Sequence, residues 1–167
     1  MSHSHVVPVL FAACCPDYAA LAMPYYSQGC LASSVGVPSP RLLNRYMSHV
    51  ARGVEHLHQH LIAHNDIKLG NILVDGANRA HLGDLGMALD MRAGSHTVTA
   101  RRVGGTRAYW SPEKVDADPR SQIDPFKVSS SVMRSCRVSG IYLRWLNYAF
   151  QWMFCDALEV SWCSLFV

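Results

Sequence analysis

The sequence has few charged residues and no long run of charge of one sign. Charged side chains make up 16% of the 167 residues, hydrophobic side chains make up 50%, and the formal net charge is +3. This balance excludes intrinsic disorder as the default interpretation. A net charge this small gives no electrostatic reason to expect a nucleic acid or an anionic membrane as the partner. A chain of this length has room for one compact domain.

The cysteines lack the spacing of a metal site or a disulfide framework. None of the six forms a C-x-x-C pair, and two of them, Cys14 and Cys15, are adjacent. We therefore expect reduced thiols in an intracellular protein and place the chain in the cytoplasm.

Long apolar runs are also missing. No uninterrupted apolar stretch reaches the ~18 residues of a membrane span. "VVPVLFAACC" at 6–15 could be the apolar part of a signal peptide, but no Lys or Arg precedes it and Pro8 interrupts it. A buried strand is the better interpretation. With the polar break at 15–17, residues 6–26 predict two adjacent strands.

A long amphipathic helix is predicted over residues 41–60. Ser39 is a suitable N-cap, and Pro40 suits the first helical position. The apolar residues that recur at three- and four-residue steps are Leu42, Leu43, Tyr46, Met47, Val50, Val54 and Leu57. This spacing places one apolar face along the helix.

Shorter elements are expected after this helix. The apolar pieces 72–74 and 80–82, joined by an Asp75-Gly76 turn, predict a pair of strands. The Gly-, Thr-, Ser- and Arg-rich segment 90–105 predicts a long mobile loop. "YWSPEKV" at 109–115 predicts the start of a short helix.

Four polar residues stand among the short apolar runs of "AHNDIKLGNILVDGANRAHLGDLGMA", residues 63–88. Asp66, Lys68 and Asn71 share one loop, and Asp84 follows the second strand between glycines that let a ligand approach closely. Mg²⁺ takes hard oxygen ligands, and a lysine can stabilise the charge of a transferring phosphoryl group. These side chains therefore suit Mg²⁺ and phosphate. The alternative is a solvated loop of ordinary polar residues.

The order of these residues resembles the protein kinase family. H-N-D-I-K-L-G-N at 64–71 is similar to the catalytic-loop motif H-R-D-x-x-x-x-N, and D-L-G at 84–86 is similar to the D-F-G triplet. G-T-R-A-Y-W-S-P-E at 105–113 resembles the end of the activation segment, and Glu113 closes its A-P-E-like triplet. The blocks follow the family's order and separations. The resemblance covers about residues 5–128.

The resemblance implies a role for each matching polar residue. Asp66 would accept or orient the proton of the substrate hydroxyl, and Lys68 would steady the γ-phosphate of ATP. Asn71 and Asp84 would hold the Mg²⁺ ions that bridge the ATP phosphates. Thr106 would fasten the activation segment to the catalytic loop. A lysine two residues after the catalytic aspartate is typical of serine/threonine kinases, which implies a protein Ser or Thr as the substrate.

The resemblance also implies an adenine pocket. "YAALAMPYYSQGCL" at 18–31 is similar to the fifth strand and hinge of a kinase. Met23 would be the gatekeeper, while the Pro24 carbonyl and the Tyr26 N–H would meet adenine. Leu73 would form the floor under the adenine ring.

Further positions match or depart from the family pattern. His64 and Leu85 would stack in the spine that links the two lobes, and Gly86 completes the D-L-G triplet. Asn65 stands where the family carries an arginine that grips a phosphorylated activation loop. Regulation by that route is therefore not expected here.

Several hydroxyl and histidine side chains have two interpretations. Ser95, Thr97 and Thr99 are either phosphorylation sites or plain loop hydroxyls. His56 and His60, with His64 four residues further on, could form a metal-binding face. No convincing fourth ligand follows them, so surface positions for His56 and His60 are the better interpretation.

The fold we predict is α+β. Residues 1–128 are expected to form a partial protein kinase domain, with the end of the small lobe, the hinge and the first half of a mainly helical large lobe. No G-x-G-x-x-G and no V-A-I-K lysine precede the hinge-like segment, and the chain begins at what the resemblance places as strand four. Residues 129–167 are an unrelated apolar and aromatic tail: a partner- or membrane-binding extension, an unstructured one, or a gene-model artefact.

The predicted function is that of a protein serine/threonine kinase that uses ATP and Mg²⁺. The predicted partners are ATP and a protein substrate. The alternatives are a non-catalytic, kinase-like (pseudokinase) binding module and an inactive truncated fragment. The sequence leaves the oligomeric state open.

Overall fold

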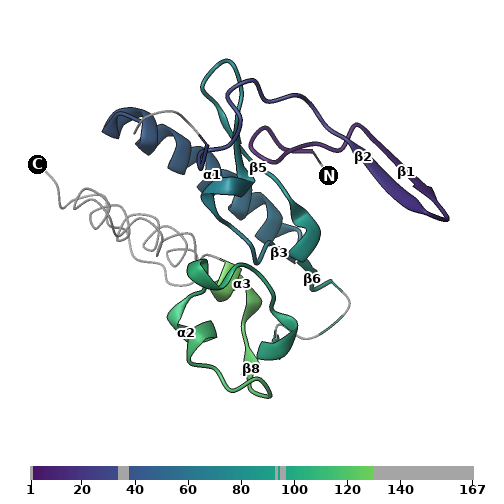
Figure 1. Ribbon diagram of the computed structural model, residues 1–167. Coiled ribbons are helices and arrows are strands. Elements are labelled where there is room, and N and C mark those ends of the chain that lie inside the picture. The colour runs from purple at the N-terminus through teal and green to yellow at the C-terminus, as the bar shows by residue number, and fades with distance from the viewer. Residues whose placement is uncertain (1, 34–37, 93, 95–96, 130–167) are drawn as a thin grey trace, which may run out of the picture. The chain divides into compact units, whose positions relative to one another are not determined.

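A computed structural model describes residues 2–33, 38–92, 94 and 97–129 of the chain (Figure 1). The chain divides into two units, Met1–Ser135 and Cys136–Val167, and every described residue belongs to the first. That unit mixes helices with short strands, in agreement with the predicted class. Ser95 and residues 130–167 of the expected tail lie outside the described residues, so the boundary at 128 stays a prediction.

The long helix α1 (Pro40–Gln59) forms where the sequence predicts it. The Ser39 hydroxyl accepts a hydrogen bond from the backbone N–H of Leu42 at 3.3 Å, which satisfies one of the N–H groups left unpaired at a helix start. Pro40 occupies the first turn, where its missing N–H costs nothing. The buried residues of the helix are Leu43, Tyr46, Val50, Gly53, Val54 and Leu57.

A small sheet packs against this helix. Strands β4 (Ile72–Val74) and β5 (Ala80–Leu82) pair antiparallel, as predicted, and the Asp75 carboxylate accepts the backbone N–H of Arg79 in the turn between them. Val6 forms a parallel bridge with Leu82, and Cys30 forms an antiparallel bridge with Leu73. The hairpin therefore has a neighbouring backbone segment on each side.

The main hydrophobic core fills the space between α1 and this sheet. Its buried residues are Val6, Tyr46, Val50, Val54, Leu57, Ile67, Ile72, Val74, Ala80 and Leu82. Burial of apolar surface stabilises a fold by roughly 25 cal/mol per Å². Because Ile67 and Ile72 belong to this core, the polar loop between them is held at both ends.

Two very short strands continue the chain around the polar loops. Strand β3 (Ile62–Ala63) pairs antiparallel with β6 (Leu89–Asp90). The 3₁₀ turns η1 (Leu69–Asn71) and η2 (Leu85–Met87) lie in the loops that follow β3 and β5.

The segment after β6 is more ordered than the predicted mobile loop. Strand β7 (Val98–Thr99) pairs with β8 (Gln122–Ile123), and η3 (Ala100–Arg102) follows β7 directly. Residues from this part of the chain form a second hydrophobic core, whose buried members are Met91, Val98, Val103 and Val128. The mobile-loop prediction is therefore wrong for the described residues 97–105. Pairing with β8, which is distant in sequence, supplies the order.

Short helical turns complete this region. They are η4 (Arg107–Tyr109), α2 (Pro112–Val115) and α3 (Pro125–Ser129). Helix α2 confirms the short helix predicted after Trp110.

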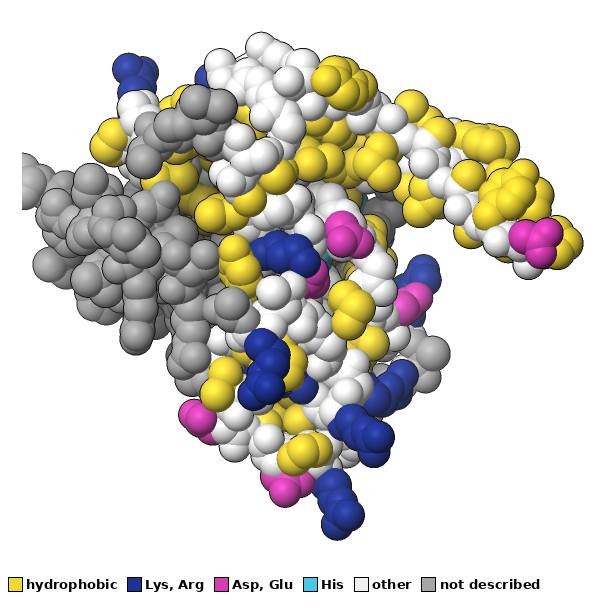
Figure 2. Space-filling view, in the orientation of Figure 1, with side chains coloured by type: hydrophobic (Ala, Val, Ile, Leu, Met, Phe, Trp, Pro, Cys, Tyr) yellow, Lys and Arg dark blue, Asp and Glu magenta, His cyan; other side chains and the backbone are white. Residues whose placement is uncertain are grey.

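The N-terminal hairpin forms as predicted but is not buried. Strand β1 (Phe11–Cys15) pairs in register with β2 (Tyr18–Ala22). Phe11 and Leu21 are each 63% exposed, and Figure 2 shows hydrophobic side chains along this ribbon. The buried-strand prediction is wrong, because the apolar side chains on both faces of this two-stranded ribbon remain exposed.

Two further expectations concern the membrane and the thiols. No helix in the described part of the chain combines the length and apolar character that a membrane crossing needs. Cys14, Cys15 and Cys30 are free thiols.

Candidate active site

Two loops meet at one end of the β4–β5 hairpin. Asn71 immediately precedes β4 and Gly83 immediately follows β5, and the Gly83 N–H donates to the Asn71 carbonyl at 2.8 Å. Strand pairing therefore brings Asn71 beside the residue that precedes Asp84. The sequence predicted that these positions share a site, and the backbone brings them together.

The Asp66 carboxylate is the centre of the site. Lys68 Nζ donates to its Oδ2 at 2.6 Å, and Asn71 Nδ2 donates to the same oxygen at 3.1 Å. The other oxygen, Oδ1, accepts the N–H and the hydroxyl of Thr106, both at 2.8 Å. Asp66 is only 6% exposed. Four of the predicted residues are thus in direct contact.

These contacts favour the charged forms of Asp66 and Lys68. Burial alone would raise the pKa of Asp66, but the hydrogen bonds from Lys68 and Thr106 lower it below its usual value. The hydrogen bond to Asp66 raises the pKa of Lys68, and the negative charges of Asp66 and Asp84 act in the same direction. The site therefore holds a carboxylate and an ammonium group side by side at neutral pH.

His64 joins the Asp66 loop to Gly83 through its two ring nitrogens. Its ring is fully buried, its Nε2 lies 2.9 Å from the Gly83 carbonyl, and its Nδ1 accepts the Asp66 N–H at 3.2 Å. Nε2 is therefore the protonated nitrogen, and burial lowers the pKa of the ring despite the Gly83 carbonyl. The predicted stacking of His64 on Leu85 stays a prediction; Leu85 is 39% exposed.

A glycine allows the later segment to reach Asp66. Gly105 has φ +96°, and a Cβ at this position would lie 2.2 Å from the Asn65 carbonyl oxygen. Both facts favour glycine here, because L side chains rarely adopt this backbone conformation. The sequence analysis gave Gly105 no role. The adjacent pair Gly104-Gly105 was the available signal.

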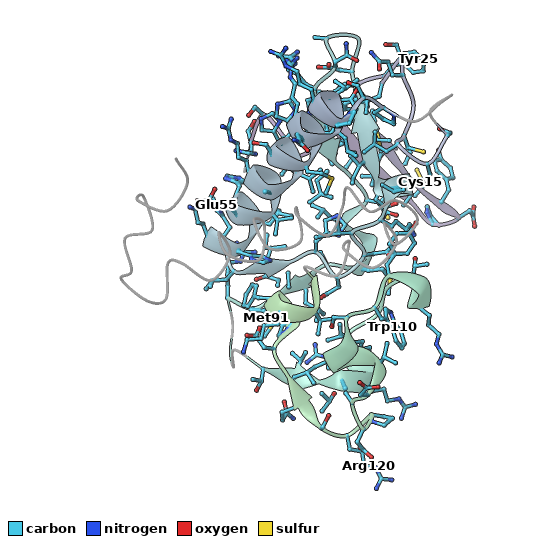
Figure 3. All side chains as sticks on the ribbon, turned by 90° about the vertical axis from the view of Figure 1, so that its left-hand side faces the viewer. Cys15, Tyr25, Glu55, Met91, Trp110 and Arg120 are labelled. Atoms are coloured by element: carbon cyan, nitrogen blue, oxygen red, sulfur yellow. The ribbon has the colours of Figure 1, made fainter. Side chains whose placement is uncertain are left out.

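The segment beyond Thr106 is fixed by Trp110, which is labelled in Figure 3. Its indole N–H donates to the Gly105 carbonyl at 3.1 Å, and Lys114 Nζ lies 4.7 Å from its ring centroid. Lys114 is buried and also donates to the Ala100 carbonyl. Glu113 belongs to α2, but its side chain lies outside what the structure describes.

Asn71 and Asp84 offer oxygen atoms that suit a hard cation. Asn71 uses its amide nitrogen to donate to the Asp66 carbonyl and carboxylate, so its Oδ1 is the atom that could bind a metal. Asp84 is exposed, has φ 59°, and accepts the Gly86 N–H at 3.2 Å. No group of three or more His, Cys, Asp or Glu suited to a metal occurs among the described residues. Two protein ligands fit Mg²⁺, which in phosphate-transfer sites also binds phosphates and water.

The residues predicted to meet adenine lie between β2 and the bridge at Cys30. Met23 is 48% exposed, while Pro24 and Tyr26 are half-buried. Leu73 is half-buried in β4, and Cys30, which closes this connection, is its bridge partner. The chain that follows the hinge-like segment thus passes beside Leu73. Contact with a nucleotide stays a prediction.

The fold and the site define a class of protein, and comparison with known proteins identifies the family. The family model described as "Protein kinase domain" matches residues 1–133. The chain belongs to the protein kinase domain family.

Individual relatives are distant and much longer than this chain. It is 31% identical over 141 residues to LysM domain receptor-like kinase 3 of Arabidopsis thaliana, covering 75% of this chain and 22% of that protein. It is 31% identical over 135 residues to serine/threonine-protein kinase mos of Xenopus laevis, covering 71% and 38%. With rhodopsin kinase grk7-b of Danio rerio, the identity is 30% over 99 residues, covering 59% and 17%.

Proposed function

We propose that the site transfers the γ-phosphoryl group of ATP to a serine or threonine hydroxyl of a protein. One observation supports this most directly. Lys68, Asn71 and Thr106 all donate hydrogen bonds to the single buried carboxylate of Asp66. A carboxylate whose pKa is held low is ionised at neutral pH, so it can accept a proton or orient a hydroxyl.

Each polar residue has a distinct part in this proposal. Asp66 orients the substrate hydroxyl and receives its proton as the new O–P bond forms. The Lys68 ammonium group, already fixed beside Asp66, stabilises the negative charge of the transferring phosphoryl group. Thr106 holds the activation-segment backbone against the loop, so that a protein substrate bound along that segment would lie near Asp66.

Mg²⁺ and ATP complete the proposed site. Asn71 Oδ1 and the Asp84 carboxylate would hold Mg²⁺, which neutralises phosphate charge when bound. Met23, Pro24 and Tyr26 would contact adenine. In this arrangement β1 and β2 belong to the small lobe, residues 23–26 to the hinge, and α1 with the later elements to the large lobe.

A second candidate function is nucleotide binding without transfer. Hydrophobic side chains of β1 and β2 are exposed on both faces of the ribbon. In this candidate, residues 23–26 and Mg²⁺ would hold ATP at the site without completing the transfer. Such a chain would act as a kinase-like binding module.

Two measurements test the proposal. The first is calorimetric titration with ATP, with and without Mg²⁺. The second is the incorporation of phosphate from ATP into a protein that contains Ser and Thr. We expect Mg²⁺-dependent binding that Asp84→Asn weakens about tenfold or more, because one metal ligand loses its charge. Asp17→Asn, which removes a carboxylate from the turn of the exposed hairpin, is the matched control and should bind as the wild type does.

The outcomes separate the candidate functions. Binding with transfer supports the kinase, and binding without transfer supports the binding module. Absence of Mg²⁺-dependent binding in a folded sample would contradict both.

A further inference from the structure

Several histidine rings lie close together where helix α1 packs against strand β5. The residues joined by ring contacts are His3, His5, His49, His56, His60 and His81. His5 stacks on His49 with 4.2 Å between centroids and 10° between planes, and His3 stacks on His56 at 4.5 Å and 13°. Stacked imidazoles at these distances are compatible with neutral rings, whereas two imidazolium ions would repel each other.

The N-terminal segment His3–Val7, here named the histidine clasp, is seated between α1 and β5. The Leu82 N–H donates to the His5 carbonyl at 2.8 Å, and the Val7 N–H donates to the Leu82 carbonyl at 2.9 Å. On the helix side, a Cβ at Gly53 would lie 2.7 Å from the His5 carbonyl oxygen. The clasp therefore depends on a close approach of its backbone to the helix.

One residue of β5, Ala80, joins the two stacked rings through its N–H and its carbonyl. His5 Nδ1 lies 3.1 Å from the Ala80 carbonyl oxygen and must donate to it. The Ala80 N–H donates to His49 Nδ1 at 3.2 Å, so this nitrogen must be unprotonated. A proton added to His49 at Nδ1 would place two hydrogen atoms against each other. The arrangement therefore exists only with neutral His49.

The charges around the pair also oppose protonation. Burial lowers the pKa of His49 to about 4, and His5, Arg45, Arg52 and His81 contribute in that order. The pKa of His5 is lowered first by burial and also by His81, Arg52 and Arg79, against the effect of the Ala80 carbonyl. Two carboxylates act on other rings of the cluster and not on the His5–His49 pair: the charge of Glu55, which is labelled in Figure 3, raises the pKa of His3, and Asp75 pairs with His81.

We infer that the histidine clasp is an acid-sensitive latch: a proton on His49 breaks its bond to Ala80, repels the stacked His5 ring, and releases residues His3–Val7 from α1 and β5. The proton acts at His49 Nδ1, the atom that accepts the Ala80 N–H in the closed form. Release would also break the hydrogen bond from the Val7 N–H to the carbonyl of Leu82, the residue that precedes Gly83. Asp84 directly follows Gly83.

The direction of the pH effect follows from the two protonation states. In the released form His49 would titrate near the ordinary value of ~6.5, and in the closed form it titrates at about 4. Between these values the released form binds more protons, so acid favours release. The ratio of the two forms changes about thirtyfold between pH ~7.5 and pH ~5 for this single group.

Hydrogen exchange of the whole chain, read by mass spectrometry at pH ~7.5 and pH ~5 and corrected for intrinsic exchange rates, tests the latch. We expect the protection of the Val7 and Leu82 amides to fall by about thirtyfold at the lower pH. In the His49→Asn variant, both amides should keep their protection at both pH values. The Asn oxygen accepts the Ala80 N–H and does not titrate. His60→Asn removes an exposed histidine at the C-cap of α1, whose ring contacts His56 rather than His5 or His49, and should behave as the wild type does.

Two further measurements keep the test decisive. Gly53→Ala should lower the protection of both amides at both pH values, since its methyl group occupies the seat of the clasp. Nitrogen-15 NMR of the wild-type imidazoles should give a pKa below about 5 for His49. A His49 pKa of about 6 or above, unchanged protection in acid, or an equal loss in His49→Asn would overturn the inference. None of these measurements involves a nucleotide, so they are independent of the proposed kinase function.

Discussion

At the scale of single residues, the Asp66 carboxylate connects the two halves of the candidate site. It joins the catalytic-loop side chains of Lys68 and Asn71 to Thr106, which lies 40 residues later. Its hydrogen bond from Lys68 is charge-assisted, and such a bond contributes about 1.5–3 kcal/mol in proteins. Lys68 is 28% exposed, which reduces the value of its ion pair because water screens the charge.

Asp66→Asn is therefore expected to lower the free energy of unfolding by about 2 kcal/mol at neutral pH. The amide cannot accept all the hydrogen bonds that the two carboxylate oxygens accept. Urea unfolding of the wild type and the variant measures the difference. Asp17→Asn, in the exposed hairpin turn, is the control for loss of a carboxylate.

The pH dependence of this difference follows from the lowered pKa of Asp66. The unfolded chain binds the proton near pH ~3.9 and the folded chain only at lower pH, so the stabilisation is complete above the unfolded value. It is lost as pH falls through the folded pKa. The gap in stability between wild type and Asp66→Asn should narrow in acid; a constant gap would show that the charge of Asp66 is not the cause.

The sequence predicted most of these residues because the loop motif is local. Asp66, Lys68 and Asn71 lie within six positions, so their proximity needs no long-range folding. Gly105 was missed because its reason for being glycine is the Asn65 carbonyl, a backbone atom far away in the sequence.

At the scale of secondary-structure elements, the start of α1 is defined by local chemistry. The Ser39 hydroxyl caps the helix and Pro40 follows it in the first turn. Both signals are visible in the sequence, and the helix begins where they predict.

Ser39→Ala is expected to lower the free energy of unfolding by about 1 kcal/mol, since the Leu42 N–H loses its acceptor. Thermal or urea unfolding followed by circular dichroism would measure the change. The control is Ser48→Ala, because Ser48 lies inside the same helix and does not cap it. Alanine has a higher helix propensity than serine, so this substitution should be neutral or slightly stabilising. Equal destabilisation by both substitutions would argue against the cap.

The shortest strands show where local patterns end. Strand β7 contains two residues, and its partner β8 is more than twenty positions away. Two residues have no periodicity to detect, so the sequence predicted a mobile loop here. The sequence also gave no signal for the histidine rings around the histidine clasp, because these rings come from separate parts of the chain: the N-terminus, α1 with its C-cap, and β5.

At the scale of the whole molecule, the β1–β2 ribbon is an exposed apolar surface. Phe11 pairs with Ala22 and Leu21 pairs with Ala12, which places Phe11 and Leu21 on opposite faces of the ribbon. The sequence predicted burial because apolar residues occupy both faces, which is typical of a covered strand. Sequence composition shows which side chains could be buried, but the packing of other elements decides whether they are.

The double substitution Phe11→Thr and Leu21→Thr tests this exposure. Threonine keeps strand propensity, and both side chains are already largely in water, so the unfolding midpoint should change little. Concentration-dependent association, measured by light scattering, should decrease because the apolar surface shrinks. A marked fall in thermal stability would instead show that other parts of the protein cover the ribbon.

The close approach at Gly105 has a consequence for inherited variation. A missense change at this codon introduces at least a methyl group into a space already occupied by the Asn65 carbonyl, and the backbone of Thr106 must move away from Asp66 in response. Such an allele would distort the candidate site while every charged side chain in it stayed unaltered. A survey that scored alleles only by the polar side chains of the candidate site would class this allele as harmless.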